Sequence, residues 1–281
     1  MGSKITIGGQ AVIEGVMMRS ETRYAICVRK PNGRISTKIV PLKKKENWYN
    51  TMPIVRGCVR FFESLKVGIE SLEFSANESQ GEDTQAIRPW EIWLAIAFSL
   101  GITVLLFYVA PLFLARLITD SSGFLFNLLD GMIRLVIFIS YLLLISLMPD
   151  IRRVFQYHGA EHKTVHCYEN KEKLTVKNVQ KYTTLHPRCG TSFILIVFIM
   201  SIVFFSFIQT QNYAERLGLR LLLLPLIAGI SYEALRGSAS RMNNPLVRIM
   251  VFPGLMLQRI TTKQPDDKMV EIAIRSLKAA L

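Results

Sequence analysis

Long uncharged apolar runs alternate with polar, basic segments along this 281-residue chain. Ile92–Ala115 and Gly190–Ala214 contain no charged residue, and each exceeds the roughly 20 residues that a helix needs to cross a bilayer. Phe124–Met148 and Leu217–Leu235 are also long and apolar but carry a few charges, so they are weaker candidates. The pattern predicts a mainly α-helical, multi-pass membrane protein with four spans.

Ionisable residues interrupt the two weaker spans. Asp130 and Arg134 lie four positions apart, on one helical face, where an ion pair would reduce the cost of burying them. Arg220 and Glu233 lie near opposite ends of the last span. Charges inside a span either pair between helices or mark a path for an ion or solute, and the sequence leaves both explanations open.

The first 89 residues show two other patterns. In residues 1–50, apolar residues alternate over Tyr24–Val28 and Ile35–Ile39 around a Pro-Asn-Gly turn, which predicts a β-hairpin in a small β-rich unit. In residues 51–89, the helical apolar spacing of Ile54–Leu72 predicts an amphipathic helix on the membrane surface. A polar linker is expected to follow it over Asn77–Gln85.

The last part of the chain, residues 237–281, has an apolar stretch and a helical pattern. Pro245–Leu257 is too short to cross a bilayer and is expected to be interfacial or re-entrant. Val270, Ile274 and Leu277 then recur at helical spacing, with Asp266 and Asp267 at the N-terminal end, where acidic side chains favour a helix.

The charge distribution predicts an orientation. Lys and Arg total 34 against 21 Asp and Glu, and they concentrate in residues 1–89, 149–190 and 236–281. The positive-inside rule then places both termini and residues 149–190 in the cytoplasm, between transmembrane hairpins at 90–148 and 191–236. Basic flanks predict affinity for anionic lipids of the bilayer. A composition that is 50% hydrophobic is atypical of a nucleic-acid-binding protein.

All four histidines of the chain lie between residues 158 and 186, with two of its four cysteines. His158, Glu161 and His162 fit the pattern H-x-x-E-H, in which two histidines on one helical face bind a cation and the glutamate is the general base. A divalent cation lowers the pKa of a bound water to roughly 7, so the pattern indicates hydrolysis. Imidazole and thiolate ligands favour zinc, with iron or manganese as alternatives.

Several side chains are candidates for a further metal ligand. His166 continues the stripe but lies about 12 Å from His158 along a helix axis, so it either supports the first two ligands or belongs to a second metal site. His186 or Cys189 supplies the third ligand if the intervening segment folds back. Further candidates nearby are Cys167 and Glu169. The alternative is a polar helix whose histidines are simply solvated.

A glycine-rich segment, Gly8–Arg19 (GGQAVIEGVMMR), is the second unusual feature. Its glycines allow close backbone approach or positive φ angles, and Glu14 and Arg19 offer a carboxylate and an anion-binding group. It lacks the lysine of a phosphate loop and the spacing of a dinucleotide-binding fingerprint. A structural turn is the simpler explanation, and packing against the histidine site is the functional one.

Four segments together resemble the YqhQ-like family of bacterial membrane proteins: Gly8–Arg19, Tyr157–Tyr168 (YHGAEHKTVHCY), His186–Ser192 (HPRCGTS) and Asn244–Asp267. The resemblance extends over the whole chain. It implies a protein of the bacterial cytoplasmic membrane, from a family described as predicted metal-dependent enzymes without an established activity.

The sequence thus favours a metal-dependent hydrolase at the cytoplasmic membrane surface, acting on a lipid-linked molecule or a membrane peptide. A transporter or channel is one alternative, in which Asp130, Arg134, Arg220 and Glu233 line a path and the histidines sense a metal or protons. A non-catalytic scaffold is another, in which the N-terminal unit and the amphipathic helix hold a partner at the membrane.

Overall fold

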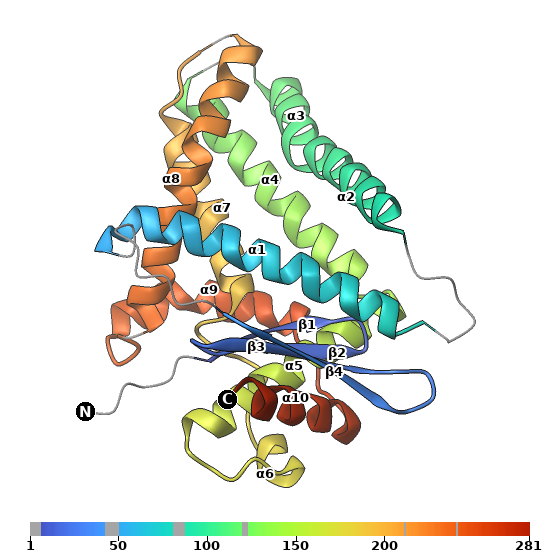
Figure 1. Cartoon of the computed structure of the whole chain (residues 1–281). Coiled ribbons are helices and arrows are strands. Elements are labelled where there is room, and N and C mark those ends of the chain that lie inside the picture. Colours follow the sequence, from blue (N-terminus) through green and yellow to red (C-terminus); the bar gives the residue numbers. More distant parts are fainter. Residues whose placement is uncertain (1–6, 43–50, 81–87, 120–122, 211, 240) are drawn as a thin grey trace.

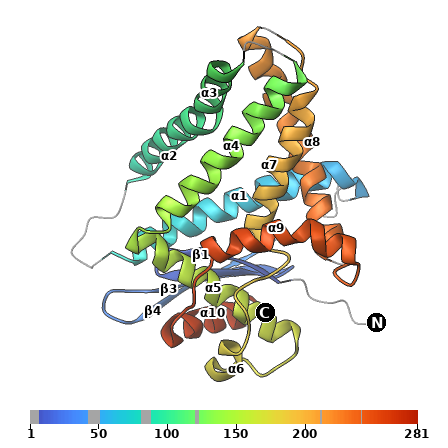
Figure 2. The ribbon, with the colours of Figure 1, turned by 180° about the vertical axis from the view of Figure 1, so that it is seen from behind.

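The computed structural model describes residues 7–42, 51–80, 88–119, 123–210, 212–239 and 241–281. Two differently built parts are stacked on each other (Figures 1 and 2). Long helices stand together in one part, and a small sheet packed with shorter helices forms the other. The candidate metal site lies where these two parts meet.

The N-terminal segment folds into a four-stranded antiparallel sheet in which the strands follow chain order. The predicted hairpin is confirmed, and Gly33 adopts the positive φ of 81° that its turn requires. The glycine-rich segment is itself a hairpin rather than an isolated turn. The strands are β1 (Gly8–Val12), β2 (Gly15–Arg19), β3 (Arg23–Arg29) and β4 (Ile35–Pro41).

Both faces of the central strands β2 and β3 are buried. Successive side chains of a strand point in opposite directions, so these strands contribute to two cores. Val16, Met18 and Cys27 face a core shared with the helices α5 (Pro149–Glu169) and α10 (Asp267–Ala280). Met17 and Ile26 face a second core that includes α1 (Pro53–Glu78). The sheet is therefore a layer between helices, with its glycine-rich hairpin held against α5.

The other part contains the apolar helices. Three of them are long and apolar enough to cross a membrane: Trp93–Ile118, Phe124–Ile145 and Ala214–Ser238. The elements are α2 (Pro89–Val104), a π-helical turn η2 (Leu105–Val109), α3 (Ala110–Ile118), α4 (Phe124–Ile145), α7 (Gly190–Ser206) and α8 (Tyr213–Ala239). The π turn precedes Pro111, whose ring cannot accommodate the regular α-helical bond pattern.

The prediction of a long span over Gly190–Ala214 is wrong in its length. The helix α7 ends at Ser206, so it is about 25 Å long against a hydrocarbon core of about 30 Å. The predicted span Gly190–Ala214 was delimited only by its lack of charged residues. It includes Gln209, Thr210 and Asn212, which are uncharged but polar, and Asn212 caps the start of α8. Even so, α7 packs between α4 and α8.

Two helices lie across the junction of the two parts, α1 and α9 (Pro245–Thr261) (Figures 1 and 2). In α1 the buried residues include Gly57, Gly68 and Ser71, whereas Phe62 and Leu65 are exposed. This is the reverse of a water-soluble amphipathic helix and suits contact with lipid. The exposed apolar residues of α9 are Leu246, Ile249, Met250 and Phe252.

The segments between these helices also bear on the predictions. The expected linker Asn77–Gln85 begins as the last turn of α1, and residues 81–87 lie outside the described part of the chain. The predicted C-terminal helix is confirmed as α10, whose N-cap Asp266 accepts a hydrogen bond from the Met269 amide. A short helix, α6 (Val176–Gln180), lies between α5 and the segment that leads to α7.

Candidate metal centre

The helix α5 supplies three of the four histidines and leads directly from α4. Pro149 at its first turn suits a helix start, because proline lacks the amide hydrogen that would be unpaired there. In the middle of α5, nearly every residue from Tyr157 to Val165 is buried. The polar residues predicted for a site are therefore not on a solvated surface, which excludes the simplest alternative for this helix.

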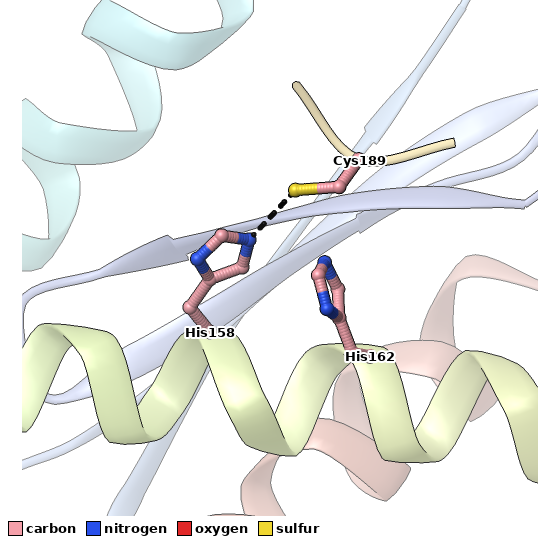
Figure 3. A group of neighbouring side chains, drawn as sticks. All are labelled: His158, His162 and Cys189. Carbon is pink, nitrogen blue, oxygen red and sulfur yellow. Dashed lines mark hydrogen bonds between the residues drawn. The ribbon is translucent and has the colours of Figure 1, made fainter. Parts of the chain in front are cut away.

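Three of the predicted ligands come together. His158 and His162 project from one face of α5 towards Cys189, which lies just before α7 (Figure 3). His158 Nε2 is 3.2 Å from Cys189 Sγ, and the two imidazole centroids are 4.4 Å apart. Two ligands that share a tetrahedral zinc ion through nitrogen and sulfur lie about 3.5 Å apart. These three side chains, the His158–His162–Cys189 group, thus have the spacing of metal ligands.

Backbone carbonyls fix the tautomer of both histidines in this group. His158 Nδ1 is 2.8 Å from the carbonyl oxygen of Thr261, and His162 Nδ1 is hydrogen-bonded to the carbonyl oxygen of Thr184. A carbonyl oxygen can only accept, so both Nδ1 atoms carry the proton and both Nε2 atoms keep a lone pair. Histidines that ligate metals are held in this way. Cys189 Sγ is free to donate to His158 Nε2 as a thiol or to ligate as a thiolate.

Glu161 lies beside this group and is buried. Its Oε2 is 3.4 Å from His162 Nε2, the nitrogen that bears the lone pair. Together with His158, His162 and Cys189, it lines a cavity of about 90 Å³. This volume accommodates a cation and a few water molecules. The carboxylate is therefore placed to exchange a proton with water in the cavity.

The hairpin β1–β2 closes one side of the cavity. Gly8 and Gly9 line it, and a Cβ on Gly9 would lie 2.6 Å from Glu161 Cγ and 2.7 Å from Glu161 Oε1. Glycine at position 9 is therefore what lets the strand approach the carboxylate. The packing of the glycine-rich segment against the histidine site, predicted as an alternative to a simple turn, is present in this contact.

Burial dominates the electrostatics of the site. It raises the pKa of the Glu161 carboxyl and lowers the pKa of His162 well below its usual value, which favours the neutral imidazole. It also raises the pKa of the Cys189 thiol to about 12. Without a cation the thiol is therefore protonated, and binding of a metal would release this proton.

The remaining two histidines form a separate group with Glu169. His166 Nε2 donates to the carbonyl oxygen of Leu185, and His186 Nε2 is 3.3 Å from Glu169 Oε2. His186 Nδ1 accepts from the Arg188 amide at 3.2 Å, so its lone pair is already used, and Arg188 also pairs with Glu169. This His166–Glu169–His186 group is consequently better suited to anchoring the loop than to binding a metal.

Cys167 belongs to neither group. It is buried in the core between the sheet and α10, with Sγ 3.8 Å from the carbonyl oxygen of Lys173. One residue advances the direction of a helical side chain by about 100°, so Cys167 points away from the stripe that contains His166. The structure places Cys167 outside the cavity and apart from the other candidate ligands, so it does not support the prediction that Cys167 is a ligand.

Glu14 and Arg19 lie outside the cavity as well. Glu14 receives two hydrogen bonds of 2.5 Å from Arg153 of α5, and its backbone φ is 51° at the tip of the β1–β2 turn. Arg19 pairs with Glu63 of α1 at 3.4 Å. The two residues tie the hairpin to helices on either side of the sheet, and they position the site without lining it.

The four charged residues of the predicted spans fall into two places. Asp130 Oδ2 accepts from Arg134 at 2.9 Å, which is the expected ion pair within α4, and from Arg220 at 2.7 Å, which joins α4 to α8. Glu233 instead pairs with Arg56 of α1 at 2.6 and 2.7 Å. At about 1.5 Å per residue, Glu233 lies about 20 Å along α8 from Arg220.

Three supporting residues were not predicted from the sequence. Gln258 of α9 is fully buried and binds both the amide and the carbonyl of His186, each at 2.8 Å, which holds the loop before Cys189. Gly159 lets the chain around Lys263 approach α5, because a Cβ there would collide with the Lys263 carbonyl oxygen. Thr261 contributes through its backbone, which leaves no signal in a side-chain pattern.

Comparisons with known proteins agree on one family. A family model described as "Protein of unknown function (DUF1385)" matches residues 52–281. The uncharacterized protein YqhQ of Bacillus subtilis (strain 168) is 34% identical over 295 residues, covering 98% of this chain and 92% of that protein. No solved structure matches the chain. The match covers all of the candidate ligands, and the chain therefore belongs to the DUF1385 family, as its resemblance to YqhQ-like proteins implied.

Proposed function

We propose that this protein is a metal-dependent hydrolase, with zinc as the preferred cation and iron or manganese as alternatives. The observation that carries the proposal is the tethering of both Nδ1 atoms, which turns the Nε2 lone pairs of His158 and His162 towards the Cys189 sulfur. Three ligands of nitrogen and sulfur with a buried glutamate beside them suit a catalytic zinc site, where the fourth position stays open.

The residues divide the chemistry between them. A divalent cation held by His158, His162 and Cys189 would supply Lewis acidity and lower the pKa of a water molecule in contact with it. Glu161 accepts the proton of the attacking water and returns it to the leaving group. Thr261 and Thr184 hold the imidazoles in the tautomer that ligation needs. The walls of the cavity exclude other water and strengthen these interactions.

The placement of the site supports a membrane-bound substrate. Cys189 caps α7, and Thr261 ends α9, so the site lies at the junction between the apolar helices and the sheet. The apolar faces that α1 and α9 expose on the same level suit the surface of a bilayer. We place the site at the cytoplasmic face of the bacterial cytoplasmic membrane, with both termini inside, where a lipid-linked molecule or a membrane peptide is within reach.

Elemental analysis tests the metal centre. The full chain is purified in detergent without chelators, beside His158→Ala, His162→Ala and Cys189→Ser. We expect about one zinc per chain in the wild type and a loss of more than tenfold in each variant. Cys167→Ser is the matched control, since it removes an equally buried thiol outside the cavity and should keep the metal. Metal-free wild type, or equal loss in Cys167→Ser, contradicts the centre.

Hydrolysis is tested separately with p-nitrophenyl acetate, a small ester that probes activated water. Glu161→Gln should keep the metal and lower the rate by about 10²-fold, the contribution of a general base. His166→Gln, outside the cavity, is the control and should retain the rate. A metal-loaded wild type no faster than buffer would contradict the hydrolytic role and leave the metal centre standing.

A further inference from the structure

The end of α3 and the starts of α4 and α8 lie at the end of the apolar helices that is away from the sheet (Figure 1). Four arginines of these helices lie in this part of the protein. Arg116, near the end of α3, and Arg216, near the start of α8, lie over the same ring of Phe126, each with its guanidinium carbon 4.9 Å from the ring centroid. Phe126 of α4 thereby connects α4 to both α3 and α8. The side chain of Arg216 is almost wholly buried, at 1% exposure.

The second pair lies one turn deeper. Arg134 of α4 and Arg220 of α8 lie over the ring of Phe205, at 5.7 and 5.1 Å. Arg216 and Arg220 are four positions apart and therefore neighbours on one face of α8. These four side chains, Arg116, Arg134, Arg216 and Arg220, are called the arginine cluster below.

Negative charge does not balance Arg134, Arg216 and Arg220. In the part of the chain that the structure describes, Asp130 is the one carboxylate that hydrogen-bonds to these three side chains, through its contacts with Arg134 and Arg220. Glu215 is exposed and hydrogen-bonded to the Thr210 hydroxyl at 2.6 Å instead. Uncompensated positive charge inside apolar helices is costly, because neither lipid nor aromatic rings replace the hydration of a cation.

The cluster also holds unused hydrogen-bond donors. In the described part of the chain, Arg134, Arg216 and Arg220 together have five buried guanidinium nitrogens without a hydrogen-bond partner: Arg134 Nε, Arg216 Nε and Nη1, and Arg220 Nε and Nη1. Arg216 and Arg220 are 1% and 2% exposed, so water at the surface does not serve these atoms. Guanidinium groups present planar pairs of donors that match the oxygen atoms of a phosphate.

We propose that the arginine cluster binds a phosphate group, carried either by an anionic phospholipid or by a soluble phosphate. Arg116 and Arg216 lie within about one helical turn of the ends of α3 and α8, the level at which a bilayer places its head groups. A phosphate there supplies the missing charge and accepts from the unused donors. This site is separate from the metal centre and does not depend on the proposed hydrolysis.

Native mass spectrometry of the full, delipidated chain in detergent tests the proposal. Phosphatidylglycerol is titrated beside diacylglycerol, which has the same acyl chains without phosphate, and inorganic phosphate is added as a competitor. We expect one phosphatidylglycerol to bind at least tenfold more tightly than diacylglycerol. Displacement by millimolar inorganic phosphate identifies a site that also takes soluble phosphate, and persistence identifies a lipid site.

Arg216→Gln should weaken phosphatidylglycerol binding at least tenfold, whereas Arg248→Gln, which removes an exposed arginine from α9, should leave it unchanged. If Arg216→Gln does not fold, Arg216→Lys keeps the charge but loses the planar fork, and it should weaken binding about threefold or more. Equal binding of phosphatidylglycerol and diacylglycerol in the wild type, or equal weakening in Arg248→Gln, overturns the proposal.

Discussion

The His158–His162–Cys189 group and the arginine cluster are both buried and polar, yet they are completed in different ways. At the proposed metal centre, backbone carbonyls bind one nitrogen of each imidazole and leave the other nitrogen directed towards the shared cavity. In the arginine cluster the side chains stack on Phe126 and Phe205, and several donors stay unused. The first arrangement suits an electron-pair acceptor such as a metal cation, and the second suits an anion.

The comparison teaches how charge is managed in each half of the protein. At the proposed metal centre, burial raises the pKa of the Glu161 carboxyl and the Cys189 thiol and lowers the pKa of His162, so it favours the uncharged form of each of these groups. Guanidinium groups stay charged in proteins, so the arginine cluster is positive whether or not it is filled. Substitutions in the two regions should therefore have different effects on the free energy of unfolding and on metal binding. Four variants test this difference.

The largest effect is expected for Asp130→Ala. It leaves Arg134 and Arg220 buried without a carboxylate, which should lower the free energy of unfolding by about 3–5 kcal/mol. Glu63→Ala breaks half-exposed pairs with Arg19 and Arg60 and should cost less than about 1 kcal/mol. Unfolding in mixed micelles, followed by circular dichroism, measures both. Equal losses would show that the arginine cluster does not depend on its carboxylate.

Gly159→Ala should come next, because its Cβ would collide with the carbonyl oxygen of Lys263. Overpacking of this kind costs about 1–3 kcal/mol, and the displaced chain takes the Thr261 carbonyl away from His158. Both the free energy of unfolding and the zinc content should fall. Gly218→Ala, which has open space around its Cβ, is the control. A metal-loaded Gly159→Ala variant of wild-type stability would break the link between this contact and the centre.

Gly9→Ala should have a smaller and more specific effect. The added Cβ would lie 2.6 Å from Glu161 Cγ and 2.9 Å from the Met17 carbonyl oxygen, so the carboxylate and the neighbouring strand β2 have to shift. We expect the three ligands to stay in place. We expect hydrolysis of p-nitrophenyl acetate to slow about tenfold, equivalent to about 1.4 kcal/mol, with the zinc content unchanged. Gly8→Ala lines the same cavity with nothing within 4 Å of its Cβ and should keep the full rate. Loss of metal in Gly9→Ala would show that the β1–β2 hairpin positions the metal ligands and not only Glu161.

The smallest effect is expected for His186→Ala. Its Nδ1 accepts from the Arg188 amide and its Nε2 faces Glu169, so it should not be a ligand. Zinc content should stay at about one per chain, and affinity measured by chelator competition should fall by less than the roughly tenfold minimum typical of residues that orient ligands. A second equivalent of zinc in the wild type, lost in this variant, would instead make the His166–Glu169–His186 group a metal site.

Much of the fold followed from local patterns. The β3–β4 hairpin was predictable because its apolar residues alternate with polar ones, and α1 and α10 were predictable because their apolar residues recur at helical spacing. The end of α7 was not, since glutamine, threonine and asparagine stop an apolar helix without adding charge. The strands β1 and β2 were missed because their glycines indicate a turn as readily as a strand.

The part of the candidate site that lies on α5 was predictable from the sequence, whereas the third ligand was not. His158, Glu161 and His162 share one helix, so their spacing alone brings them together. The third ligand was open between His186 and Cys189, and the structure brings Cys189 to His158. The position of Cys189 depends on Gln258 of α9, which hydrogen-bonds to the backbone of His186 and so holds the loop before Cys189. A contact between residues so far apart in the sequence leaves no local sequence pattern.

Cys189 is at once a wall of the cavity and the N-cap of α7, where its sulfur accepts from the Thr191 amide. Any sliding of α7 along its axis carries the sulfur with it. Ligand distances at a metal tolerate about 0.2 Å, so the proposed centre would form at only one axial position of that helix. If the centre binds a cation, its affinity would therefore depend on how α7 is positioned among its apolar neighbours.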